Sequence, residues 1–211
     1  MIQQMQQLPT MKTQLLFDLE STGLLRQGSR IHCIVMRDAK DNSTLVFDNQ
    51  PERALIQGVK QLENADALIG HNIINYDIPL IKEQFEDFNP QGEIIDTLVL
   101  SRLYYPQIIE RDYEIRPRNM PQRLYGRHSL EAWGYRLKCF KGDFGKSDSN
   151  DWSTYTPEML DYCAQDVVVS VQLAKMFEPK LEQYAACIKT EHQIAELMIW
   201  QEQEGFPFDV R

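Results

Sequence analysis

Two carboxylates stand two residues apart at the end of an apolar run. The segment LLFDLESTGLL, residues 15–25, is typical of a buried strand and carries Asp18 and Glu20. Because alternate residues of a strand point to the same side, both acids face one spot. Without a partner they would repel each other and resist ionisation, so a cation is expected close by. Ordinary exposed acids at a strand end are the alternative explanation for this pair taken alone.

A third acid follows a second apolar run. In GHNIINYDIPLI, residues 70–81, the apolar strand ends at Asn72, and Tyr76 and Asp77 begin a helix. Asp77 therefore lies near the C-terminal end of a strand, where open α/β sheets place their sites. An aspartate that only caps the helix is the alternative.

The fourth acid lies on a helix. In DYCAQDVVV, residues 161–169, Tyr162 and Asp166 are four residues apart and share a helix face. Asp166 enters an apolar run, where a carboxylate needs a partner; an acid on the helix surface is the alternative. Taken together, the four acids supply the oxygen ligands that suit two hard cations, Mg²⁺ or Mn²⁺. No His/Cys set with zinc-ligand spacing competes.

The elements that must position these residues alternate along the chain. Apolar runs predict strands over residues 13–20, 31–38, 43–49, 65–72 and 93–97. Periodicity and capping residues predict helices over 51–63, 76–85, 97–105, 128–138, 156–177 and 181–204. Residues 105–127 lack periodicity and are expected to form a long basic loop, which is either solvated or in contact with phosphate. The order predicts an α/β domain with a mixed sheet and helices on both faces.

Composition limits the classes of protein that fit. The 211 residues are 43% hydrophobic and 25% charged, which is enough for a full core. Four scattered cysteines indicate free thiols in a reducing cytoplasm, and no apolar run is long enough to span a membrane. The net charge of −9 is a weak argument against nucleic-acid binding, because acids that hold cations are neutralised in a working site.

The motifs resemble those of a known superfamily. FDLESTGL, HNIINYD and YCAQD are similar to the three motifs of 3′–5′ exonucleases that use four acidic ligands and a tyrosine, with a ribonuclease H-like fold and a five-stranded mixed sheet. IIDTLVLSRL, HSLEAWGYRLK and the closing EQEGFPFD resemble the proofreading domain of family A DNA polymerases of T-odd phages, from about Gln14 to Asp209.

This resemblance implies roles for individual residues. Two divalent cations, Mg²⁺ or Mn²⁺, would be held by Asp18, Glu20, Asp77 and Asp166, with Asp18 shared between them. Tyr162 and Glu20 would orient the attacking water. The expected substrate-binding residues are Leu24, which would wedge between terminal bases, Asn72 and Tyr76.

The resemblance also implies partners and an organisation. We expect a cytoplasmic monomer in a bacterial or phage-infected cell that binds a DNA 3′ end and no membrane. The expected organisation is an N-terminal tail over 1–13, an exonuclease domain over 14–179, and a C-terminal helix over 180–211 leading toward a polymerase domain that this chain lacks.

Three alternatives differ in function or context. They are a free-standing exonuclease, an RNA-directed exonuclease of the same fold, and a catalytically silent nucleic-acid-binding module. A metal-free acid/base hydrolase needs only two carboxylates and leaves two unexplained.

Overall fold

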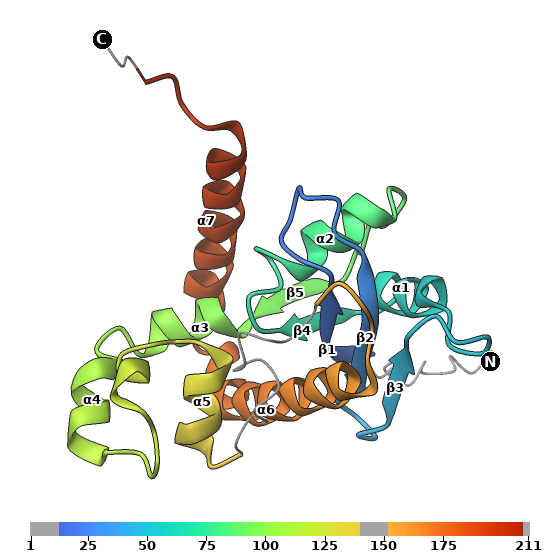
Figure 1. Cartoon of the computed structure of the whole chain (residues 1–211). Helices are drawn as coiled ribbons and strands as arrows, with labels where there is room; N and C mark the ends of the chain where they lie inside the picture. The colour runs from blue at the N-terminus through green and yellow to red at the C-terminus, as the bar shows by residue number, and fades with distance from the viewer. Residues whose placement is uncertain (1–12, 140–151, 209–211) are drawn as a thin grey trace, which may run out of the picture.

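The computed structural model describes residues 13–139 and 152–208, and its centre is a five-stranded sheet in the order β3-β2-β1-β4-β5 (Figure 1). The strands are β1 (Gln14–Ser21), β2 (Ile31–Asp38), β3 (Thr44–Phe47), β4 (Ala67–Gly70) and β5 (Glu93–Asp96). β1 pairs antiparallel with β2 and parallel with β4, so the expected mixed sheet is confirmed.

Alternation along β1 divides the core into two layers. Leu15, Phe17 and Leu19 belong to one buried cluster, and Leu16 belongs to the other. Asp18 and Glu20 continue the Leu16 side, since strand side chains alternate between the two faces of a sheet. Both acids therefore face the layer that contains the longest helix.

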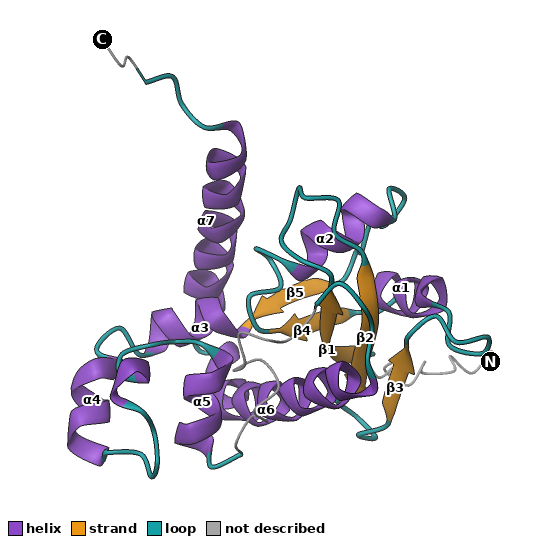
Figure 2. Ribbon diagram, in the orientation of Figure 1, coloured by secondary structure: helices purple, strands orange, loops and turns teal. Residues whose placement is uncertain are grey.

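Helices cover both faces of the sheet, as expected (Figure 2). The first cluster is completed by α1 and α2, and the second by α3, α4, α5, α6 and α7. The helix bounds are α1 (Leu55–Glu63), α2 (Asp77–Gln84), α3 (Thr97–Tyr104), α4 (Ile108–Ile115), α5 (Leu130–Leu137), α6 (Pro157–Leu181) and α7 (Ala185–Glu204).

Capping residues set several helix ends where the sequence indicated them. The Thr156 side chain accepts a hydrogen bond from the Met159 N–H at 3.3 Å, and Pro157 occupies the first helical position. Ser129 caps α5 in the same way. α1 begins only at Leu55, because Pro51 lies in a tight turn closed by the Gln50–Arg53 bridge, so the expected start at residue 51 is wrong.

The segment 105–127 is not the long loop that the sequence predicted. It contains α4 and a short 3₁₀ helix, η1 (Gln122–Leu124). The buried side chains of α4 are those of Ile108 and Asp112. A carboxylate occupies a core position, so the apolar periodicity that reveals most helices is missing.

The C-terminal helix α7 runs away from the sheet, as Figure 1 shows. The expected boundary between residues 179 and 180 falls inside the last turn of α6. Of the expected N-terminal tail, only Thr13 lies within the described residues; there its backbone N–H donates to Asp66 Oδ2 at 2.7 Å. Among the described residues no helix combines the length and the apolar character needed to cross a membrane.

Candidate active site

The two acids of β1 meet a side chain of α6. One carboxylate oxygen each of Asp18 and Glu20 and the thiol sulfur of Cys163 all lie within 4.8 Å of one another. β1 positions the two acids, and Glu20 of this strand pairs with Cys33 of β2. α6 positions Cys163, because this helix packs across β1 and β2.

The third and fourth acids are buried beside the same strand. Asp77 begins α2 and Asp166 lies on α6, and each is only 4% exposed. The Asp77 carboxylate is hydrogen-bonded by the backbone of Leu19, which stands between the two acids of β1. Burial, followed by the negative charges of Asp96 and Asp166, raises the pKa of Asp77 to about 8. The fold therefore gathers all four predicted acids around the end of β1.

This set of donors fits hard divalent cations. Carboxylate oxygens are their preferred ligands, and a cation would offset the repulsion that raises the pKa of Asp77. Tyr162 lies one helical turn before Asp166 on α6, as predicted, and its ring meets that of Trp152 edge-on at 6.4 Å between centroids. The expected tyrosine is thus on the helix that supplies the fourth acid.

Cys163 had no sequence signature, yet it lines the acidic cluster. The residue is fully buried, and its thiol is hydrogen-bonded with that of Cys33. Burial, the Cys33 contact and the charge of Asp18 all raise the pKa of the Cys163 thiol well above its ordinary value. The group stays protonated and forms a neutral wall of the site.

Asp96 is a second residue that sequence reasoning missed. It ends β5, is 2% exposed, and accepts hydrogen bonds from the backbone N–H groups of Asn72 at 2.8 Å, Ile74 at 3.1 Å and Leu98 at 2.8 Å. The first two donors belong to the loop that joins β4 to Asp77. The signal was present in EIIDT, an apolar strand that ends in an acid, as in LLFDLE.

The predicted substrate-binding residues lie in the segments that follow β1 and β4. Leu24 is 65% exposed in the loop after β1. Tyr76 donates its hydroxyl to the Gly23 carbonyl, and that hydroxyl also meets the Ser21 hydroxyl at 2.6 Å, so Tyr76 fastens the loop that carries Leu24. Asn72 adopts the left-handed conformation with φ of 68°, held by Asp96.

A mixed sheet with strand order 3-2-1-4-5 and four acids around its first strand defines the ribonuclease H-like class of α/β proteins. The family model of the RNase H superfamily matches residues 15–177, and the chain belongs to that superfamily.

Curated relatives agree with the predicted resemblance to phage polymerases. The chain is 30% identical to the DNA-directed DNA polymerase of Enterobacteria phage T3, over 93% of this chain and 34% of the relative. It is 29% identical to the corresponding polymerase of Escherichia phage T7, over 92% of this chain and 33% of that protein. The chain spans about a third of the length of these relatives.

Solved structures confirm the fold. Brucella melitensis NrnC superposes with a TM-score of 0.62 at 20% identity, covering 94% of this chain and 91% of NrnC. NrnC has also been solved with bound Mg²⁺ and bound to pGG. Escherichia coli RNase D, an exoribonuclease, superposes with a TM-score of 0.57 at 13% identity, covering 88% of this chain and 44% of RNase D.

Proposed function

We propose that this chain is a metal-dependent 3′–5′ exonuclease that releases 5′-mononucleotides from the 3′ end of DNA. The convergence of Asp18, Glu20, Asp77 and Asp166 around the end of β1 carries the proposal. The phage polymerase relatives favour DNA as the substrate and a role in proofreading beside a polymerase domain. The Mg²⁺-bound form of NrnC supports a divalent cation as the cofactor.

The side chains divide into ligands and positioning groups. Asp18, Glu20, Asp77 and Asp166 would hold two divalent cations, with Asp18 shared. When bound, such cations lower the pKa of water and stabilise the charge on the reacting phosphate. Tyr162 and Glu20 orient the water that attacks the terminal phosphodiester. Leu24 stacks on the terminal base and Asn72 contacts the strand, so base sequence has little influence on binding.

The first experiment removes the two acids of β1. Asp18→Ala with Glu20→Ala should abolish release of a 3′ label from single-stranded DNA in Mg²⁺ or Mn²⁺, because two ligands are lost. Glu93→Ala, an exposed acid of β5, is the matched control and should retain full activity. Circular dichroism and thermal unfolding establish that both variants are folded. Undiminished label release by the double variant would overturn the proposal.

A second experiment identifies the direction and the substrate. Degradation from the 3′ end releases a 3′ label at once and leaves a ladder of shortening 5′-labelled products. Rates on DNA and RNA strands of the same sequence test the choice of DNA. A large preference for RNA would show that the RNA-directed alternative is correct, whereas cation binding without cleavage of either strand would indicate a silent binding module.

A further inference from the structure

A basic cavity lies apart from the acidic cluster. It encloses about 320 Å³ between α4, the turn that follows it, and α5, and Met176 of α6 closes one side. Asp166 precedes Met176 by ten residues on the same helix. At a rise of 1.5 Å per residue, the cavity is therefore displaced about 15 Å along α6 from the acidic cluster. We call this cavity the α4–α5 pocket.

Positive charge concentrates in this pocket although the whole chain is acidic. Its lining includes Arg111, Arg116, Arg118, Arg136 and Lys138, against Asp112 as its acid. Within residues 13–139 and 152–208, Arg116, Arg118 and Lys138 take part in no ion pair. In a chain of net charge −9, this local excess of cations forms a distinct electropositive site.

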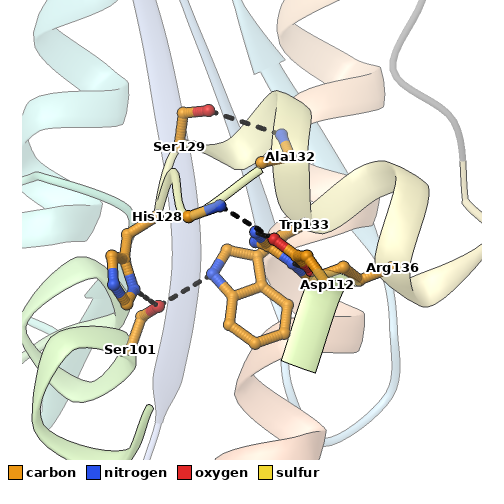
Figure 3. A network of polar contacts seen from close by, with 8 residues as sticks. Ser101, Asp112, His128, Ser129, Ala132, Trp133 and Arg136 are labelled. Atoms are coloured by element: carbon orange, nitrogen blue, oxygen red, sulfur yellow. Dashed lines mark hydrogen bonds and ion pairs between the residues drawn. The ribbon is translucent and has the colours of Figure 1, made fainter. Parts of the chain in front are cut away.

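One buried guanidinium leaves donors unused at this site. Arg136 donates through Nε to Asp112 Oδ1 at 2.9 Å and through Nη2 to Asp112 Oδ2 at 2.7 Å (Figure 3). Its side chain is 9% exposed and lies over the Trp133 ring at 5.0 Å. Its Nη1 is buried and has no hydrogen-bond partner in the described structure. Asp112 therefore does not exhaust the hydrogen-bonding capacity of this guanidinium, which also lines the cavity.

The size of the site favours an extended anion over a small one. Arg118, Tyr135 and Lys138 also line an adjoining hollow of about 600 Å³, so the two cavities share one wall. Aromatic residues also contribute to the lining, namely Tyr105, Trp133 and Tyr135. Cations beside aromatic rings in adjoining cavities are typical of binding to the backbone and bases of a single strand.

We propose that the α4–α5 pocket binds backbone phosphates of a nucleic-acid strand, upstream of the 3′ end that enters the acidic cluster. Arg116, Arg118 and Lys138 supply the phosphate contacts, and Arg136 adds a further positive charge to the lining. The position upstream of the reacting end rests on the proposed exonuclease function. The proposal that the pocket binds phosphate does not depend on that function.

The test reverses charge in the pocket and compares a matched reversal elsewhere. Arg118→Glu with Lys138→Glu changes two exposed side chains of the pocket. Lys60→Glu with Lys189→Glu makes the same change of net charge on exposed positions of α1 and α7. The affinity of each variant is measured by fluorescence anisotropy with labelled single-stranded DNA of about 4 and about 16 nucleotides. The measurements are made in Ca²⁺ at several salt concentrations.

The pocket variant should bind the longer strand roughly tenfold more weakly, with a salt slope smaller by about two, because about two phosphate contacts are lost. Binding of the short strand should stay unchanged, as should the control variant with either strand. Equal losses in both variants, or no loss in either, would overturn the proposal. Displacement of the long strand by pyrophosphate at similar concentrations would assign the pocket to a small phosphate instead.

Catalysis separates this proposal from the proposed function. In Mg²⁺ the pocket variant should show a raised KM for the long strand and an unchanged kcat. If the unmodified chain cleaves no strand, the exonuclease proposal fails while the binding data still decide the role of the pocket. If cleavage is normal but the pocket variant binds normally, only the pocket proposal fails.

Discussion

The backbone N–H of Asp96 donates to Nε2 of His192 at 2.8 Å, and this bond joins the edge of the acidic cluster to α7. The other ring nitrogen, Nδ1, donates to the Ile188 carbonyl at 2.8 Å. The two bonds together define a neutral imidazole with its proton on Nδ1. α7 is therefore anchored at its N-terminal half to the strand that carries Asp96.

Loss of this ring should loosen α7. His192→Phe keeps the volume approximately but leaves the buried N–H of Asp96 without an acceptor, which costs about 1–3 kcal/mol. The free energy of unfolding, measured by urea denaturation, should fall by that amount. Gln193→Ala changes the exposed neighbour and should have an effect within about 0.5 kcal/mol. Equal stability of the two variants would show that the His192 contact contributes nothing.

Asp96→Asn should impair the site without touching a predicted cation ligand. An amide offers one acceptor oxygen where the carboxylate serves three backbone N–H groups, so at least one donor is left unsatisfied. We expect a loss of about 1–3 kcal/mol in stability. We also expect slower release of a 3′ label, because the loop before Asp77 loses its support.

The conservative exposed variant Glu93→Gln on the same strand serves as the control for Asp96→Asn. It should change neither the unfolding free energy nor the rate of label release. Normal turnover in Asp96→Asn would mean that the β4–α2 loop holds its conformation without the carboxylate.

Divalent cations should stabilise the protein against heat through the acidic cluster. A cation at a hundred times its Kd adds about 2.7 kcal/mol to the unfolding free energy, since it binds the folded chain only. Mg²⁺ and Mn²⁺ should therefore raise the Tm, and Asp18→Ala with Glu20→Ala should remove the increase. An equal increase in Tm for both proteins would place cation binding elsewhere.

The contribution of His128 to the stability of the folded chain should be lost in mild acid. Burial, followed by the charges of Arg136 and Arg102, lowers the pKa of His128 below its ordinary value of 6.5. The unfolded chain then binds the proton more tightly, so the contribution of His128 is complete above pH 6.5 and is lost as the pH falls below it. Its Nδ1 lies 2.6 Å from the Ser101 hydroxyl, which accepts from Trp133 Nε1 (Figure 3).

The check for His128 is a difference measurement. Unfolding free energies of the unmodified chain and of His128→Asn are compared across this pH range, and the free energy of the unmodified chain relative to that of the variant should fall as the pH decreases below 6.5. Parallel curves would assign the acid sensitivity to other groups, such as Asp112. At Asp112, burial alone would raise the pKa of the carboxyl group. Hydrogen bonds from Arg136 and Gly126 outweigh this effect of burial, so the pKa of Asp112 is lowered.

Most of the fold was predictable because its strands are apolar runs with clear ends. The β1 and β2 segments differ from their predicted bounds by one residue at most. The acids of β1 were recognisable because carboxylates interrupt an otherwise apolar pattern. Asp96 carries the same signal, yet as a single acid at a strand end it also fits an ordinary helix cap, and it does cap α3.

The missed features depend on contacts between distant segments. α4 buries Asp112, whose partner Arg136 lies on α5, so no local pattern distinguishes this helix from a polar loop. Cys163 reaches the acids only because α6 crosses β1, a packing relationship that spacing does not contain. The α4–α5 pocket likewise required knowing which basic residues of the 105–127 segment face α5.

The central position of β1 in the sheet has a consequence for hydrogen exchange. β1 has a paired neighbour on both sides, whereas β3 and β5 form the edges. Edge strands open in local fluctuations, but amides of a central strand exchange only when the whole domain unfolds. We expect Phe17 to be among the slowest-exchanging amides, so partly opened forms of the chain would still present Asp18 and Glu20 on an intact strand.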